Sequence, residues 1–276
     1  MTMAMAGTLR ASACLSAAAA GLLVVLAGCA TPQQGQGQEN TVTSVVTPSD
    51  ETEARRRARI RLELAGGYFE QGQTDIALDE LKQATAADPT FADAYNLRGL
   101  IFLRLNDMRQ AEESFRRALA LNSRDADTHH NYGWMQCQQK RYPEAQRSFD
   151  VALTNPTYGG RSKTLMAMGL CQARAGQLAE AERGLARSYE LDAGNPITGY
   201  NLTQLLFTRG DFPRAQFYIR RLNNSELANA ETLWLGIKVE QRMNDAVALE
   251  QLADQLRKRF PQSRERALLD RRAFNE

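Results

Sequence analysis

The stretch RQAEESFRRALALNS, residues 109–123, contains a small residue at Ala111, a large apolar residue at Phe115 and another small residue at Ala118. Spacings of four and three residues place all three on one face of an α-helix. The same pattern recurs at residues 75–89, 143–157, 179–193 and 213–227. The anchor alanines of the five stretches are 34, 34, 36 and 34 residues apart: Ala77, Ala111, Ala145, Ala181 and Ala215. A period near 34 indicates a repeat architecture.

The residues upstream of each anchor alanine repeat as well. Twelve residues before it stand Ala65, Gly99, Gly133, Gly169 and Thr203, and nine residues before it stand Tyr68, Phe102, Gln136, Gln172 and Leu206. This pattern resembles the tetratricopeptide repeat, in which two antiparallel helices occupy 34 residues. A single pair cannot bury its apolar face, so the pairs must stack. The sequence therefore predicts an all-α fold, a tetratricopeptide-repeat superhelix (a right-handed α-solenoid) of five to six helix pairs.

The period also sets the boundaries of the repeats. We expect five units at about 58–91, 92–125, 126–159, 162–195 and 196–229. A sixth unit at about 229–262 matches less well, although Gly236, Ala248 and Leu252 fit the pattern. The charged tail that follows is interpreted as a terminal cap with a solvated outer face.

The first residues differ from the rest in composition. Arg10 is the only charged residue before Glu39, and residues 11–30 are small or apolar. A transmembrane anchor needs about 20 apolar residues, and this run is only marginally long enough. A secretory signal has a basic start, a short apolar centre and small residues before the cleavage site, and all three features are present. The sequence therefore predicts a signal peptide at residues 1–28.

The run ends in Leu-Ala-Gly-Cys at residues 26–29, which resembles the lipobox of bacterial lipoproteins. The resemblance implies that Cys29 is acylated and becomes the first mature residue. Ala30 is not aspartate, so the sorting rule of such lipoproteins favours the periplasmic face of the outer membrane. We expect residues 29–53 to be the lipidated N-terminus and a flexible polar tether, and residues 54–276 to form the repeat domain.

Composition and motifs argue against an enzyme and against a nucleic-acid partner. The 34 Lys and Arg nearly balance the 32 Asp and Glu, so no global field favours a polyanion. The arginines at 55–61 have glutamates close by and are interpreted as a solvated helix face. His129 and His130 are neighbours, about 100° apart on a helix, and cannot grip one metal ion together. We expect a protein that binds other proteins, with no enzymatic activity, cofactor, metal or small-molecule substrate.

The tetratricopeptide resemblance also implies a protein-binding groove. In that family the concave face uses positions 2, 5, 9, 12 and 13 of each unit. Carried over to this chain, the predicted groove residues are Leu62, Phe69, Asn96, Leu100, Leu103, Arg104, His130, Trp134, Gln138, Met166, Tyr200 and Phe207, and Lys163, Leu170 and Arg174 satisfy the same rule. For each apolar member the alternative is packing between neighbouring helices. We expect the first three units to bind the partner, with Trp134 as the aromatic anchor.

Two cysteines remain after Cys14 leaves with the signal and Cys29 is acylated. Cys137 and Cys171 fall at positions 12 and 10 of the first helices of neighbouring units, which differ by 200° at 100° per residue. Their side chains therefore face each other across helices about 10 Å apart, which leaves roughly 5.4 Å between the Cα atoms. Disulfides persist in an oxidising periplasm. The sequence predicts a Cys137–Cys171 bridge, and two buried thiols are the alternative.

The lipobox, the tether and the repeats together resemble one family. The segments that carry the likeness are ARIRLELAGGYFEQGQTDIALDEL (58–81), AYNLRGLIFLRL (94–105) and NYGWMQCQQKRYPEA (131–145). They resemble the type IV pilus biogenesis and stability lipoproteins, pilotins that help the pilus secretin to reach and assemble in the outer membrane. The resemblance implies a non-enzymatic lipoprotein that binds secretin subunits. The alternative is a lipoprotein scaffold for peptidoglycan enzymes, because such repeats serve many partners.

Overall fold

The computed structural model describes residues 50–274, and within that range thirteen α-helices follow one another without a strand. The signal peptide, Cys29 and the tether up to residue 49 lie outside the described residues, as do residues 275 and 276. All described residues belong to one compact unit. The predicted all-α repeat fold is confirmed.

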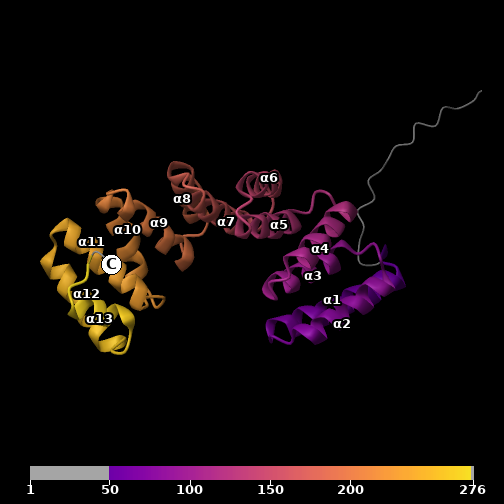
Figure 1. Cartoon of the computed structure of the whole chain (residues 1–276), viewed down its shortest axis with the longest axis horizontal. Helices are drawn as coiled ribbons and strands as arrows, with labels where there is room; N and C mark the ends of the chain where they lie inside the picture. Colours follow the sequence, from indigo (N-terminus) through magenta and orange to yellow (C-terminus); the bar gives the residue numbers. More distant parts are fainter. Residues whose placement is uncertain (1–49, 275–276) are drawn as a thin grey trace, which may run out of the picture. The chain divides into compact units, whose positions relative to one another are not determined.

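Twelve of these helices form six consecutive pairs (Figure 1). The first helices of the pairs are α1 (Glu53–Glu70), α3 (Ala92–Arg104), α5 (Ala126–Gln138), α7 (Arg161–Arg174), α9 (Pro196–Thr208) and α11 (Ala230–Met243). The second helices are α2 (Thr74–Ala87), α4 (Met108–Leu121), α6 (Tyr142–Leu153), α8 (Leu178–Leu191), α10 (Phe212–Asn223) and α12 (Ala246–Arg259). Each pair packs against the next, and contacts also join α1 to α3, α3 to α5, α5 to α7 and α9 to α11. First helices of these neighbouring pairs therefore lie beside one another.

Small residues let the two helices of a pair approach closely. The five anchor alanines of the second helices are fully buried. Gly99 of α3 faces Phe115 of α4 so closely that a Cβ at Gly99 would lie 2.6 Å from the ring. Gly133 of α5 repeats this contact with Phe149 of α6, where a Cβ would lie 3.0 Å from the ring. Optimal carbon contacts need about 3.5–4.0 Å, so glycine sets how closely these pairs pack.

The turn inside each pair contains one residue with a left-handed backbone. Three of these residues are glycines with φ of 78°, 78° and 80°: Gly72, Gly176 and Gly210. The other three have φ of 60°, 60° and 58°: Asn106, Lys140 and Asn244. Asparagine tolerates this conformation because its short side chain can hydrogen-bond locally. Lys140 lacks that compensation, so its turn is strained where the other five are not.

The sixth pair has the same geometry as the others, and a thirteenth helix covers it. Helix α12 contains 14 residues, as do α2, α4 and α8. Helix α13 (Arg264–Asp270) packs against α11 and α12 and buries Leu268 and Leu269. Beyond it, Phe274 stacks on Trp234 of α11 with the ring centroids 5.5 Å apart. This C-terminal segment therefore covers apolar surface of the sixth pair.

Candidate protein-binding groove

A hollow of about 810 Å³ runs over the first helices of the second to fifth pairs. Its lining residues come from α3, α5, α7 and α9: Leu100, His130, Asn131, Trp134, Lys163, Met166, Ala167, Leu170, Ala173, Arg174, Ile197 and Asn201. Seven of the twelve are apolar and six come from α7. The volume and the apolar character are typical of ligand-binding pockets in proteins.

One stripe along α7 lines the hollow, with members three, four and four residues apart: Lys163, Met166, Leu170 and Arg174. Residues at these spacings lie on the same side of a helix. Ala167 and Ala173 flank the stripe, and their short side chains leave room that longer ones would fill. The stripe is therefore apolar in its centre, with one cation near each end of the helix.

Trp134 of α5 lies beside this stripe and has two sets of contacts. Its ring faces the guanidinium of Arg174, whose central carbon lies 4.9 Å from the ring centroid. The same side chain packs against a buried cluster that contains Phe149 and Cys137. Trp134 therefore lines the hollow and also packs between helices, which were the two alternatives for an apolar groove residue.

His130 joins α5 to α7 near the start of both helices. Its Nδ1 lies 3.0 Å from Thr164 Oγ1, and its ring is almost fully buried. Burial, with a smaller contribution from Lys163, lowers the pKa of His130 to about 4. The imidazole is therefore uncharged at neutral pH. Beside it, Asn131 donates from Nδ2 to Asn96 Oδ1 across 3.0 Å, which joins α5 to α3.

Four of the predicted groove residues meet in this hollow: Leu100, His130, Trp134 and Met166. Asn96 is occupied by its hydrogen bond to Asn131. Leu62 and Leu103 pack at the edges of buried clusters. Gln138 is exposed at the end of α5. The hollow extends from the second pair to the fifth, whereas we expected the first three pairs to provide the surface.

The other predicted groove residues contact different partners. The Arg104 guanidinium lies 3.8 Å from the centroid of the Phe69 ring and donates to the Phe69 carbonyl oxygen at 2.8 Å, so it covers that ring. Tyr200 and Phe207 of α9 line two smaller hollows that α9 forms with α11. Phe207 lies there beside Phe212, with ring centroids 5.5 Å apart.

Three lining residues lie outside the predicted set for a common reason. Asn131, Ala167 and Asn201 all occupy position 6 of their units, counted from residues 126, 162 and 196. The rule taken from the family resemblance omits position 6. Ile197, at position 2 of the fifth unit, satisfies that rule and also lines the hollow. The sequence thus contains a periodic signal for these residues, one position per unit.

The structure joins Cys137 of α5 and Cys171 of α7 by a disulfide. Their Cα atoms lie 5.8 Å apart, within the usual range for a disulfide and close to the spacing expected from the repeat geometry. Both residues are buried in one cluster with Phe149 and Ala167. Because Ala167 also lines the hollow, the bridge lies next to the lining.

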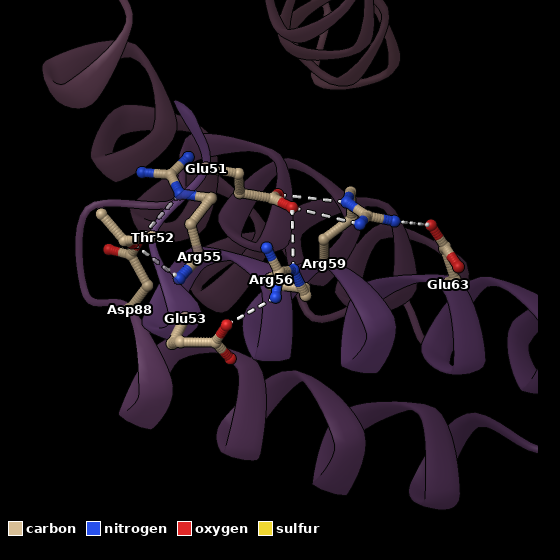
Figure 2. A network of polar contacts seen from close by, with 8 residues as sticks. All are labelled: Glu51, Thr52, Glu53, Arg55, Arg56, Arg59, Glu63 and Asp88. Carbon is tan, nitrogen blue, oxygen red and sulfur yellow. Dashed lines mark hydrogen bonds and ion pairs between the residues drawn. The ribbon is translucent and has the colours of Figure 1, made fainter. Parts of the chain in front are cut away.

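The arginines of α1 are paired with carboxylates (Figure 2). Arg59 contacts Glu51 at 3.1 Å and Glu63 at 2.9 Å. Arg55 contacts Asp88, the residue directly after α2, at 2.6 Å. These ion pairs neutralise much of the positive charge of α1, as expected for a solvated helix face. They also join the residues just before α1 to the first pair.

Within residues 50–274 no cluster of three or more His, Cys, Asp or Glu side chains is arranged to hold a metal ion. The two histidines have separate contacts: His129 Nε2 lies 3.0 Å from the carbonyl oxygen of Ser123, while His130 contacts Thr164. In the same described range, none of the helices combines the length and the apolar character that crossing a membrane requires.

The chain is similar to known proteins over most of its length. The tetratricopeptide-repeat family model matches residues 62–126 and 101–160. The type IV pilus assembly protein PilF of Pseudomonas aeruginosa is 31% identical over 244 residues, which are 88% of this chain and 93% of PilF. The solved structure of P. aeruginosa PilF has a TM-score of 0.72 and 27% identity, covering 80% of this chain and 100% of that one. The crystal structure of PilW, a widely conserved type IV pilus biogenesis factor, has a TM-score of 0.70 and 30% identity, covering 77% of this chain and 98% of that one.

Proposed function

Since the chain belongs to the family of tetratricopeptide-repeat proteins of type IV pilus biogenesis that includes PilF and PilW, we propose that it promotes assembly of the pilus secretin in the outer membrane. In this proposal the protein is not an enzyme. Acylated Cys29 holds it at the periplasmic face of the outer membrane. Its repeat domain binds secretin subunits, which favours their localisation and multimer assembly and therefore pilus formation.

The hollow over α3, α5, α7 and α9 is the observation that best supports a binding role. Covering apolar side chains with a partner releases about 25 cal/mol for each Å² removed from water. Trp134 offers an aromatic anchor, and its contact with Arg174 restrains both side chains before a partner arrives. Side chains that are already ordered lose less entropy on binding.

The tether suits a protein that acts close to the membrane. Residues 31–52 are polar and contain two prolines and two glycines. In this proposal residues 31–49 act as the tether, because Glu51 pairs with Arg59 and Thr52 caps α1. A flexible chain of 19 residues would span about 24 Å on average, from about 5–6 Å times the square root of its length. The repeat domain would reach secretin subunits near the bilayer surface without touching it.

Deletion of the gene, followed by complementation, tests the proposal. We expect the deletion strain to lose SDS-resistant secretin multimers and pili while it keeps secretin monomers, because the protein acts on assembly. Wild-type protein should restore multimers. Trp134→Ala should restore few, since losing an interface anchor of about 2 kcal/mol weakens binding about 30-fold. Phe217→Ala is the matched control, because Phe217 is an exposed aromatic residue of α10 outside the hollow.

Two outcomes would contradict the proposal. Intact secretin multimers in the deletion strain would remove the role in assembly. Altered cell shape with intact multimers would favour the alternative, a lipoprotein scaffold for peptidoglycan enzymes. Circular dichroism of each variant shows whether the repeats are folded, because a melted Trp134→Ala protein would show packing and not binding.

The membrane anchor has its own test. A Cys29→Ser protein should lose acyl labelling and leave the outer-membrane fraction, because three acyl chains hold a protein far more firmly than contacts with a partner alone. Fractionation of a secretin-deletion strain removes partner contacts as a second cause of retention. Wild-type levels of Cys29→Ser protein in that outer-membrane fraction would rule out the lipid anchor.

A further inference from the structure

The charges around the hollow are all of one sign. Of the twelve lining residues, Lys163 and Arg174 are cations, and none carries a carboxylate. The polar remainder consists of two asparagines and His130, whose Nδ1 contacts Thr164. The surface that a partner would meet is therefore apolar and positively charged, although the whole chain is nearly neutral.

Neither cation of the hollow has a carboxylate partner among the residues that the structure describes. The Arg174 guanidinium lies over the Trp134 ring, and neither Arg174 nor Lys163 forms an ion pair with a residue between 50 and 274. The arginines of α1 are a useful contrast, because Arg59 there lies between two glutamates (Figure 2). An exposed cation whose protein offers no carboxylate is free to pair with one from a partner.

The two cations also lie at a defined spacing. They are eleven residues apart on α7, which is about 16 Å along the helix axis and only about 20° around it. Met166 and Leu170 lie between them on the same face. The order along this face is therefore cation, two apolar side chains and cation. Arg174 is further restrained by its contact with Trp134.

We propose that the hollow binds an extended segment of a partner protein in which two acidic side chains flank five apolar residues. This inference rests on the proposed function, in which the hollow is the binding surface. An extended chain advances about 3.3 Å per residue and its side chains alternate between two faces, so carboxylates that face the same way are an even number of residues apart. Six residues span about 20 Å, which two long, flexible cationic side chains about 16 Å apart at their backbones can reach. A hollow of 810 Å³ has the volume of a pocket for a small ligand, which suits a few side chains better than a helix of three turns.

Fluorescence anisotropy with two synthetic peptides tests the inference. One peptide carries Leu-Val-Phe-Leu-Val between two aspartates, and the other carries the same five residues between two lysines. Both are titrated with the full-length protein in a nonionic detergent, and binding to protein-free micelles is subtracted. We expect the aspartate peptide to bind at least about tenfold more tightly, because it replaces two repulsions with two ion pairs. The preference should shrink at high salt.

Substitutions in the protein identify the charges responsible. Lys163→Glu/Arg174→Glu should reverse the preference, so that the lysine peptide binds more tightly. Lys163→Gln/Arg174→Gln should abolish it. The matched control is Lys82→Glu/Arg109→Glu, because both residues are exposed on second helices outside the hollow and the net charge changes equally. This control should keep the aspartate preference.

Several results would overturn the inference. They are equal binding of the two peptides, no binding of either, or an unchanged preference after the charge reversal at Lys163 and Arg174. Dimerisation of the protein that the same reversal abolishes would assign the hollow to a second copy of the chain. Because no secretin is present in the assay, a preference that holds while the deletion strain keeps its multimers overturns only the proposed function. If the peptides bind equally while the deletion strain loses its multimers, only the chemistry inferred for the hollow is overturned.

Discussion

Gly99→Ala tests how the helix pairs are packed. The new Cβ would lie 2.6, 2.7 and 2.8 Å from three carbons of the Phe115 ring, where contacts of about 3.5–4.0 Å are optimal. Phe115 is fully buried, and Tyr132 lies beside it with ring centroids 6.0 Å apart, so the ring cannot simply move away. Overpacking of this kind costs about 1–3 kcal/mol. Alanine recovers about 0.5–1 kcal/mol as a better helix former, so the middle of the two ranges gives a net loss of about 1 kcal/mol.

Gly66→Ala is the matched control for this change. Gly66 also lies inside a first helix, but a Cβ there would have nothing within 4 Å. The control should therefore gain about 0.5–1 kcal/mol from helix propensity alone. Urea unfolding followed by circular dichroism measures both variants, and an unchanged slope lets the midpoints be compared. Gly99→Ala combined with Phe115→Leu should recover part of the loss. The reasoning would be refuted if Gly99→Ala were as stable as wild type, or if both alanine variants were stabilised equally.

Three other changes have expected outcomes. Cys137→Ser/Cys171→Ser should lose up to about 3–4 kcal/mol, because the bridge closes a loop of 34 residues; two free thiols in unreduced, denatured wild-type protein would show that the bridge does not form. Lys140→Gly should raise the free energy of unfolding by about 0.5–1 kcal/mol, measured in urea, since glycine relieves the left-handed φ of 60°. A matched Lys140→Ala variant should show no gain. Acidification from pH 7 to pH 4 should lower the free energy of unfolding by up to about 3 kcal/mol through His130. Its pKa of about 4 in the folded state lies below the value of about 6.5 in the unfolded state, so the unfolded state takes up the proton first. His130→Gln should abolish this part of the pH dependence, and a variant with the same pH profile as wild type would contradict the assignment.

The helix pairs could be predicted from the sequence because their determinants lie within one unit. The small residue at Gly99 and the large residue at Phe115 are 16 positions apart, and they meet in the turn-linked pair that contains both. Five of the six left-handed turn residues are glycine or asparagine, which the sequence marks by residue type. Lys140 gives no such signal, because the packing of the helices on either side holds it in that conformation.

The groove was harder to predict because it depends on contacts between units. Phe69 fits the family rule, but Arg104 of the next pair covers its ring. Trp134 also fits, and Arg174 contacts its ring without removing it from the hollow. Sequence position alone does not separate the two cases, since each consists of an arginine beside an aromatic ring. The neighbouring side chains distinguish the two rings. Next to Trp134, the short side chains of Ala167 and Ala173 line the hollow and leave space for a ligand.

The hollow also lies at the junction where the repeat spacing lengthens from 34 to 36 residues. Two extra residues precede α7, and three contacts hold this junction, one from the loop to α5 and two between α5 and α7. Tyr158 of the inserted loop donates to Asp127 at 2.8 Å, His130 contacts Thr164, and a disulfide joins the helices near their C-terminal ends. An inserted loop loosens a junction between repeats, because its backbone loses more entropy when it becomes ordered. The three contacts oppose that effect on the two helices that carry Trp134, Met166 and Leu170. The geometry of the binding surface therefore depends on a junction that the regular repeat pattern alone would leave weak, and damage to these contacts should reduce binding before it reduces helix content.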